Sequence, residues 1–365
     1  MDEKGTAAID SNGLFDPQNL TADWSFCMDK LYTGAITVEP VTGDGKVFVV
    51  DANSYIYAID IDSGELRWAA NPIWGDNYGV ESCTPAYDGK VLYVVLQCRV
   101  SSTTVSVVAL STADGSVLWT NTGIDTKGGR VDSPVRYDSG RIYFGSSGTN
   151  ASFYCLSASN GSVLWSYKTA ADVGRSGAAI VGDYVVFGDM SGTLYVLNST
   201  GVLKSTLDVN TLPGIAGAGI NSTVVYSEGR LYFTASSSSR GYCISMGIDA
   251  SGQLRTNGIR WTVIDPTSST PALYDGYIYV GSGTPGATYG RLYCIEADTG
   301  RAVWSRVLDG PVLSSPAIMI MFHGDIYVGV TTANTIGGLY LYDNDGDRVF
   351  AHVPPAVSYT HLTLP

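Results

Sequence analysis

The sequence predicts an all-β chain that folds as a β-propeller of four-stranded blades. Three observations support this prediction: an eleven-residue pattern recurs along the chain, a second hairpin pattern precedes each copy, and the copies are about one blade apart. The composition agrees, because 43 glycines among 365 residues, with 45% hydrophobic and 15% charged residues, suit a repeat array of strands and turns.

The recurring pattern consists of a strand, a tight turn and a second strand. Its first clear copy spans residues 58–68, AIDIDSGELRW. The residues at 62–64 have turn composition, because Asp and Ser bond nearby backbone groups and Gly accepts positive φ. We expect the closing tryptophan to bury its ring against the neighbouring repeat. Further copies lie at 109–119, 155–165 and 294–304, and looser copies end at Lys204, Trp261 and Phe350.

The second pattern is a hairpin upstream of each frame. Residues 84–93, TPAYDGKVLY, place Asp-Gly between two apolar runs, which is a strong hairpin signal. Counterparts lie at 133–143, 270–279 and 315–327. Each repeat therefore consists of strand A, a short turn, strand B, a variable loop, strand C, a short turn and strand D.

The repeat count predicts seven complete blades plus one orphan N-terminal strand around Trp24. An orphan D strand needs A, B and C strands from the other chain end, yet the seventh repeat already has its own D segment around Phe350. We therefore expect a truncated eight-bladed ring, with a seven-bladed ring as the alternative. The expected organisation is a flexible lead-in at 1–20, the propeller at 21–352 and a non-repeat tail at 353–365. The tail resembles translated sequencing-adapter sequence, and a natural tail is the alternative.

The eleven-residue pattern resembles the tryptophan-docking motif of the pyrroloquinoline-quinone-like (PQQ-like) β-propeller repeat family. Ala58, Asp60, Ser63, Gly64 and Trp68 match that motif position by position. The resemblance implies a blade-packing role for the motif, and it is nearly silent on function. The implied docking residues are Trp24, Trp68, Trp119, Trp165, Trp261 and Trp304, with Gly64, Gly115, Gly161 and Gly300 in the turns.

The charge balance limits the partners of the protein. A net charge of −13 repels phosphate backbones and anionic lipid, so we expect neither nucleic-acid binding nor docking on such a membrane. The hydrophobic runs have strand length, so we expect no membrane insertion. The N-terminus lacks the apolar core of a signal peptide. Either the protein stays inside the cell, or the chain is a fragment without its leader. The resemblance favours the second reading, because PQQ-like propellers that are low in lysine and rich in Ser, Thr, Gly and Tyr look like exported modules. We therefore expect an extracellular, cell-surface or periplasmic location.

The six cysteines fall into two groups. Cys155, Cys243 and Cys294 occupy one equivalent strand-C position, held by Ala58 and Ala109 in other repeats, and are expected to be small buried core residues. Cys27, Cys83 and Cys98 are scattered, and their disulfide state is left open. Pairing of strands A and B would place Cys83 opposite about Val94, which disfavours a simple bridge to Cys98.

Several catalytic chemistries find little support in the sequence. Resemblance to quinoprotein dehydrogenases would imply calcium, an acidic base and a disulfide between adjacent cysteines, and no two cysteines are adjacent here. The acidic run at 343–347 has oxygen-rich composition but lies at a C–D turn and lacks the trailing Glu of an EF-hand. We therefore expect no catalytic residues, no metal site and no cofactor.

The connections offer one functional signal. In a propeller the A–B and C–D turns lie on one face, and the B–C and D–A connections lie on the other. The second set is long and varied, at 71–80, 97–104, 121–130, 145–152, 209–221, 234–241 and 281–290. Variety on a rigid scaffold indicates a recognition face. Its binding candidates are Trp74, Asp76, Asn77, Tyr78, Arg99, Lys127, Arg130, Arg175, Arg240 and Tyr289, of which Arg130 and Arg175 precede strand A and are expected near the central channel.

The sequence thus favours a non-catalytic propeller that acts as a rigid scaffold and binds a protein or glycan ligand on its long-loop face. A PQQ-dependent quinoprotein dehydrogenase, or a degenerate relative of one, is the first alternative. A scaffold similar to the propeller lipoprotein of outer-membrane assembly is the second. The ligand and the oligomeric state are left open.

Overall fold

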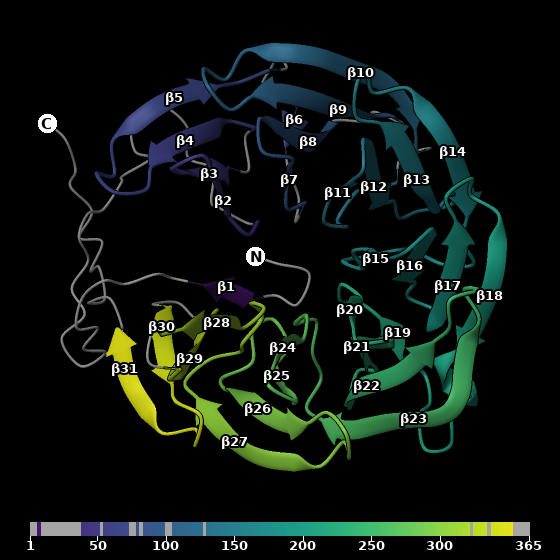
Figure 1. Cartoon of the computed structure of the whole chain (residues 1–365), viewed down its shortest axis with the longest axis vertical. Helices are drawn as coiled ribbons and strands as arrows, with labels where there is room; N and C mark the ends of the chain where they lie inside the picture. The colour runs from purple at the N-terminus through teal and green to yellow at the C-terminus, as the bar shows by residue number, and fades with distance from the viewer. Residues whose placement is uncertain are drawn as a thin grey trace, which may run out of the picture.

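The computed structural model describes residues 6–8, 38–51, 54–72, 78–79, 83–98, 104–126, 129–321, 324–333 and 337–352. The strands in these ranges form seven sheets around one central axis (Figure 1). The predicted all-β propeller is confirmed, and it has seven blades.

The blades follow one another along the chain. Blades 1 and 2 comprise β2 (Val41–Gly43), β3 (Lys46–Val50), β4 (Ile56–Asp60) and β5 (Leu66–Ala70), then β6 (Tyr78–Gly79), β7 (Ala86–Tyr87), β8 (Val91–Cys98), β9 (Thr104–Ser111) and β10 (Val117–Asp125). Blades 3 and 4 comprise β11 (Arg136–Asp138), β12 (Arg141–Gly145), β13 (Ser152–Ser157) and β14 (Val163–Lys168), then β15 (Ala179–Val181), β16 (Tyr184–Gly188), β17 (Thr193–Asn198) and β18 (Leu203–Asp208).

The remaining three blades complete the ring. Blade 5 comprises β19 (Gly219–Ile220), β20 (Val225–Ser227), β21 (Arg230–Ser236), β22 (Gly241–Ile248) and β23 (Leu254–Ile264), and the 3₁₀ turn η2 (Val209–Thr211) precedes it. Blade 6 comprises β24 (Ala272–Tyr274), β25 (Tyr277–Ser282), β26 (Gly290–Glu296) and β27 (Ala302–Leu308). Blade 7 comprises β28 (Ala317–Ile320), β29 (Ile326–Thr332), β30 (Gly338–Tyr342) and β31 (Arg348–His352).

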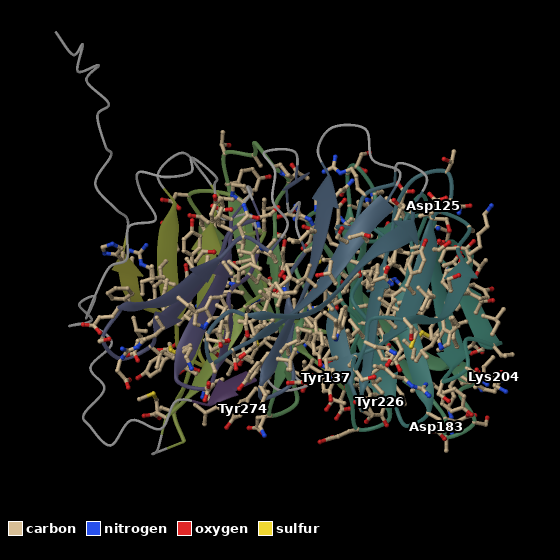
Figure 2. All side chains as sticks on the ribbon, turned by 90° about the horizontal axis from the view of Figure 1, so that it is seen from above. Asp125, Tyr137, Asp183, Lys204, Tyr226 and Tyr274 are labelled. Atoms are coloured by element: carbon tan, nitrogen blue, oxygen red, sulfur yellow. The ribbon has the colours of Figure 1, made fainter. Side chains whose placement is uncertain are left out.

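Each blade is an antiparallel meander that starts at the axis and ends at the rim (Figure 1). Consequently the A–B and C–D turns lie on one face and the other connections on the opposite face. Figure 2 shows this separation, with Tyr137, Tyr226, Tyr274, Asp183 and Lys204 at one face and Asp125 at the other. We call the face of Asp125 the long-loop face and the opposite one the turn face.

The structure does not support the expected truncated eight-bladed ring. The first and last described blades each have all four strands of the repeat, and they meet at the channel, where the Ser315 hydroxyl donates to the Glu39 carboxylate over 3.2 Å. The eight-blade expectation depended on an orphan strand around Trp24, and that residue lies outside the described part of the chain.

A short N-terminal strand adds to the last blade. β1 (Thr6–Ala8) pairs in parallel with β28, with Thr6 opposite Ile318 and Ala8 opposite Ile320. This strand lies within the segment 1–20 that the sequence assigns to a flexible lead-in. The predicted domain boundaries stay predictions.

Indole docking joins successive blades. Trp68 in β5 donates its Nε1 hydrogen to the carbonyl of Thr112, which lies in the C–D turn of the next blade, over 3.0 Å. Gly115 in that turn has φ +73°, and a Cβ there would lie 2.6 Å from the Trp68 ring. Trp119, Trp165 and Trp304 donate in the same way to the carbonyls of Ala158, Ser199 and Asn344. Gly161, Gly201 and Gly346 pack on these three rings.

Two blades use a different docking residue from the one expected. In blade 5, Thr262 lies opposite Cys243, as Trp68 lies opposite Ala58, whereas Trp261 lies opposite Ile244. Because a shift of one residue turns a strand side chain to the other face, Trp261 packs into the core between blades 4 and 5. The Thr262 hydroxyl instead donates to the carbonyl of Gly300.

Blade 4 shows the same one-residue displacement. Ser205, and not Lys204, lies opposite Val196. The turn is one residue shorter than in blade 1, because Gly201 follows Asn198 by three positions whereas Gly64 follows Asp60 by four. The Ser205 hydroxyl donates to the carbonyl of Gly252 over 2.7 Å.

In the described residues no helix is both long and apolar enough to span a bilayer.

Candidate functional site at the channel mouth

The central channel contains two adjoining cavities of about 160 and 560 Å³. The smaller lies among the inner strands, and the larger lies at the starts of those strands on the long-loop face. Glu39, Thr223, Thr270 and Ser315 line both cavities, so the two are neighbours. Arg136 lines only the smaller cavity, and Arg175 lines only the larger.

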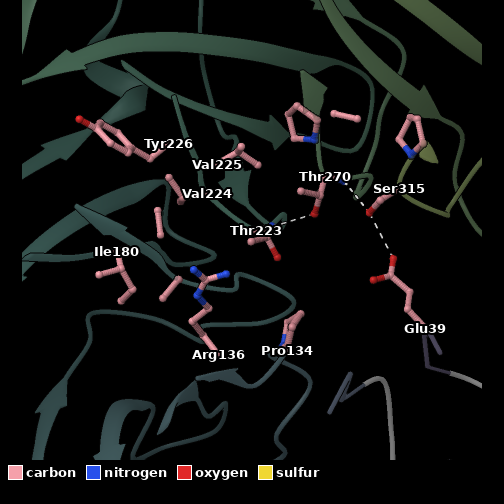
Figure 3. Close-up of a pocket in the computed structure, with 15 residues that line it drawn as sticks. Glu39, Pro134, Arg136, Ile180, Thr223, Val224, Val225, Tyr226, Thr270 and Ser315 are labelled. Atoms are coloured by element: carbon pink, nitrogen blue, oxygen red, sulfur yellow. Dashed lines mark hydrogen bonds between the residues drawn. The ribbon is translucent and has the colours of Figure 1, made fainter. Parts of the chain in front are cut away.

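A chain of hydrogen bonds runs across one side of this channel mouth. The backbone N–H of Thr223 donates to the Thr270 hydroxyl over 3.1 Å, and the N–H of Thr270 donates to the Ser315 hydroxyl over 3.3 Å. The Ser315 hydroxyl in turn donates to Glu39 (Figure 3). These residues occupy equivalent positions, each two residues before the first pairing residue of an inner strand. The ring symmetry therefore places hydroxyl groups and one carboxylate side by side.

A belt of buried hydroxyl groups supports the mouth from behind. Ser176 and Ser269 are fully buried. The Ser176 hydroxyl accepts a hydrogen bond from the N–H of Gly188, and the Ser269 hydroxyl accepts one from the N–H of Gly281. Ser269 also donates to the carbonyl of Ser314 in the next blade over 3.0 Å. Cys83 occupies the equivalent position in blade 2, where it is buried and has a free thiol. The belt fixes the starts of the inner strands relative to one another.

Tyrosine hydroxyls clamp the connections of the long-loop face. The Tyr195 hydroxyl donates to the Asp189 carboxylate over 2.8 Å, and the Tyr340 hydroxyl donates to Asp309 over 2.6 Å. Burial, together with these carboxylate partners, raises the pKa of both phenols to about 12. Four equivalent tyrosines form the same kind of contact. Two of them donate to carboxylates, Tyr57 to Asp51 and Tyr293 to Asp265. The other two donate to backbone carbonyls, Tyr154 to Asp125 and Tyr242 to Gly214.

The buried carboxylate of Asp189 is fully engaged in this clamp. It accepts hydrogen bonds from Ser191, Thr193, Tyr195 and the N–H of Ala171. Saturation of its oxygens explains how a carboxylate with no exposed surface is tolerated. The group shapes the B–C turn of blade 4 and holds the preceding D–A connection.

Four of the ten predicted binding residues have described side chains on the long-loop face. Arg175 and Arg240 are exposed, Tyr289 is 52% exposed, and the Arg130 guanidinium lies 3.8 Å from Asp132. Of these four residues, Arg175 lines the larger cavity at the channel mouth. Tyr78 forms part of β6, opposite Cys98, and its side chain is not described. Trp74, Asp76, Asn77, Arg99 and Lys127 lie outside the described residues.

Two charged residues of the channel escaped the sequence analysis, namely Glu39 and Arg136. Each belongs to the inner-strand hairpin pattern, in which Thr84, Thr270 and Ser315, each followed by proline, stand two residues before the first pairing residue, where blade 3 has Pro134. Alignment of these hairpins would have placed Glu39-Pro40 with them. A charged side chain at a position that holds small residues elsewhere was the available signal.

The described cysteines are structural. Cys155, Cys243 and Cys294 are buried on strand C of their blades, as expected, and all are free thiols. Burial raises the pKa of Cys83, Cys243 and Cys294 to about 12 and that of Cys155 to about 11. Such thiols are poor nucleophiles. Cys27 and the side chain of Cys98 lie outside the description.

The acidic turn at 343–347 docks on the preceding blade. Its Asn344 carbonyl accepts a hydrogen bond from Trp304 Nε1. The Gly346 and Asp345 carbonyls accept hydrogen bonds from the guanidinium of Arg306. That guanidinium also lies 5.4 Å from the Trp304 ring centroid. The Asp343 carboxylate accepts the N–H groups of Asp345 and Asp347. The turn interpretation accounts for all of these contacts. No group of three potential metal-ligating side chains occurs within the described ranges.

Comparisons with known proteins agree with this architecture. The family model for outer membrane protein assembly factor BamB matches residues 71–284 and 247–362. The structure of BamB from Moraxella catarrhalis aligns with a TM-score of 0.62 at 17% identity, over 87% of this chain and 85% of its own. Quinohemoprotein alcohol dehydrogenase from Comamonas testosteroni aligns with a TM-score of 0.69 at 13% identity, over 96% of this chain and 71% of its own.

A third structure, the computationally designed Ika8 protein, aligns with a TM-score of 0.60 at 15% identity, over 88% of this chain and 87% of its own. At these identities the alignments show the fold. A search of curated proteins gave no match.

Proposed function

Because the chain belongs to the PQQ-like propeller family described as outer membrane protein assembly factor BamB, we propose that it is a non-catalytic scaffold that binds other proteins. Its working surface is the long-loop face, centred on the channel mouth. The family description favours an assembly role, and the structures with the same fold include both an assembly factor and a dehydrogenase. Fold alone therefore does not decide between these roles, and the two faces of this chain do.

The observation that carries the proposal is the different use of the two faces. On the turn face, the C–D turns are occupied by docking of the preceding blade, as at Trp68 and Thr112. On the long-loop face, tyrosine hydroxyls clamp the connections, while the exposed side chains of Arg175, Arg240 and Tyr289 remain on the surface. Arginine and tyrosine are enriched among the residues that contribute most to binding at protein interfaces, so their exposure on this face favours protein recognition.

A retention experiment tests this proposal with matched variants. Purified wild-type protein, R240A/Y289A on the long-loop face and K204A/Y277A on the turn face are immobilised and exposed to an envelope extract of the producing cells. Retained proteins are quantified by mass spectrometry. Lys204 and Tyr277 are exposed and match the first pair in charge and in the tyrosine ring, so the comparison isolates the face.

We expect the wild type and K204A/Y277A to retain the same proteins, and R240A/Y289A to lose at least about tenfold of that retention, as for removal of two interface anchors. Equal retention by all three proteins would contradict the proposal. Retention that is abolished by glycosidase treatment of the extract would replace protein with glycan as the ligand. Dye-coupled alcohol oxidation after addition of PQQ and calcium would establish the dehydrogenase alternative instead.

The location outside the cytoplasm is part of the same proposal, since it depends on the low-lysine composition and on the family description. Fractionation of the producing cells, with antibody detection, is the test. Recovery in the cytoplasmic fraction would refute it.

A further inference from the structure

The channel differs in charge from the rest of the molecule. The chain carries a net charge of −13, yet the charged side chains found among the described lining residues of the two cavities are Arg136, Arg175 and Glu39. Two guanidinium groups and one carboxylate make this the site where an anionic group is attracted to an otherwise acidic protein.

The charges are arranged around the cavity and not side by side. Figure 3 shows the Arg136 guanidinium pointing toward Thr223, while Glu39 reaches the cavity from another side and accepts from Ser315. Arg136 is half-buried, so the low local dielectric strengthens its attraction for an anion. Arg175 is exposed at the mouth and can attract the same anion as it enters.

The size of the cavities limits the ligand. The inner cavity of about 160 Å³ is smaller than the 300–1,000 Å³ of common cofactor pockets. A single carboxylate-bearing side chain fits that volume. The outer cavity of about 560 Å³ can hold a few residues of extended chain, and its Thr and Ser hydroxyls offer hydrogen bonds to a peptide backbone.

We propose that the channel mouth binds an acidic side chain of an extended peptide segment, with the carboxylate directed to Arg136 and Arg175 and a backbone N–H donating to Glu39. Glu39 gives the preference for a peptide over a simple anion, because its charge repels a ligand that carries no donor. This inference rests on the proposed function and names the kind of protein segment that the long-loop face receives.

The test is calorimetric titration of the whole protein with a short probe, N-acetyl-Ala-Ala-Asp-Ala-amide. The Asn analogue of this peptide and free succinate are titrated beside it. The variants are R136Q and R175Q in the channel, with R301Q as the matched control at an exposed arginine of the β26–β27 turn on the turn face. Circular dichroism and melting temperature establish that each variant is folded, and exposed Arg175 provides a readout even if R136Q is unstable.

We expect the Asp peptide to bind at least about tenfold more tightly than the Asn peptide, as for loss of one charge-assisted contact. R136Q and R175Q each remove that preference, whereas R301Q keeps it. Any of three results would overturn the inference. The two peptides could bind equally, neither could bind at millimolar concentration, or succinate could bind with the same affinity as the Asp peptide. If the channel variants keep the preference while R240A/Y289A still loses its protein, the channel inference fails and the proposed function stands.

Discussion

Replacement of Gly115 by alanine should destabilise the propeller by closing the space that the Trp68 indole occupies. Gly115 lies in the C–D turn of blade 2 at φ +73°, and a Cβ there would lie 2.6 Å from Cε3 of Trp68, which is 8% exposed. Either the turn or the indole must move. If the indole moves, it also loses its hydrogen bond to the Thr112 carbonyl.

The expected loss can be divided into three contributions. A positive φ costs an alanine about 1–2 kcal/mol, overpacking of a filled site costs about 1–3 kcal/mol, and a lost hydrogen bond costs about 1 kcal/mol. Gly140→Ala is the matched control, because Gly140 has φ +78° and open space around the added Cβ. It isolates the first contribution. The free energy of unfolding should therefore fall about 2–4 kcal/mol further in G115A than in G140A.

Urea unfolding followed by circular dichroism and tryptophan fluorescence measures both variants. A double-mutant cycle with Trp68→Ala makes the test specific, because without the indole G115A should cost no more than G140A. Equal destabilisation by the two glycine variants, or strict additivity of G115A and W68A, would refute the docking argument.

Three further predictions follow from the same contacts. Thr262→Val removes the hydroxyl that donates to Gly300 and should lower the free energy of unfolding by about 1 kcal/mol, whereas Thr256→Val on the exposed part of β23 should leave urea unfolding unchanged. The described cysteines should resist iodoacetamide in the folded protein at pH 8, as measured by peptide mass spectrometry. Burial raises their pKa in the folded protein to about 11–12, above the unfolded value near 9. Their contribution to stability is therefore present below pH 9 and is lost as the pH rises toward 11–12. Hydrogen bonds from the Ser116 hydroxyl and N–H lower the pKa of Asp114 in the folded protein from 3.8. The contribution of Asp114 to stability is therefore present above pH 3.8 and is lost as the pH falls through the lowered pKa. Asp114→Asn should be less stable than wild type at pH 7, and the difference between their urea midpoints should shrink at pH 2.

The sequence allowed the blade contacts to be predicted wherever the turn length was constant. Trp68, Trp119, Trp165 and Trp304 each close an unmodified frame, and each docks on the following turn. Where the turn changes length, counting from the pattern fails by one residue. That is why Ser205 and Thr262 replace the expected Lys204 and Trp261.

The channel site could not be predicted because it forms only when the ring closes. Ser315 and Glu39 are 276 residues apart and belong to the last and first blades. Arg136 comes from a third blade, and no local pattern connects these residues. Arg175 was found because it lies in the connection that leads into an inner strand. The repeated tyrosine clamp was visible as Tyr before Ala58, Cys155, Cys243 and Cys294, but its partners lie in connections of irregular length.

Photo-crosslinking in the producing cells tests the central claim, that the long-loop face is the working surface, most directly. A benzophenone amino acid replaces Tyr289 on the long-loop face or Tyr277 on the turn face, two tyrosines that are 52% and 38% exposed. We predict protein adducts after irradiation at position 289 and none above background at position 277. Adducts at position 277 alone, or equal adducts at both positions, would contradict the assignment of the working surface.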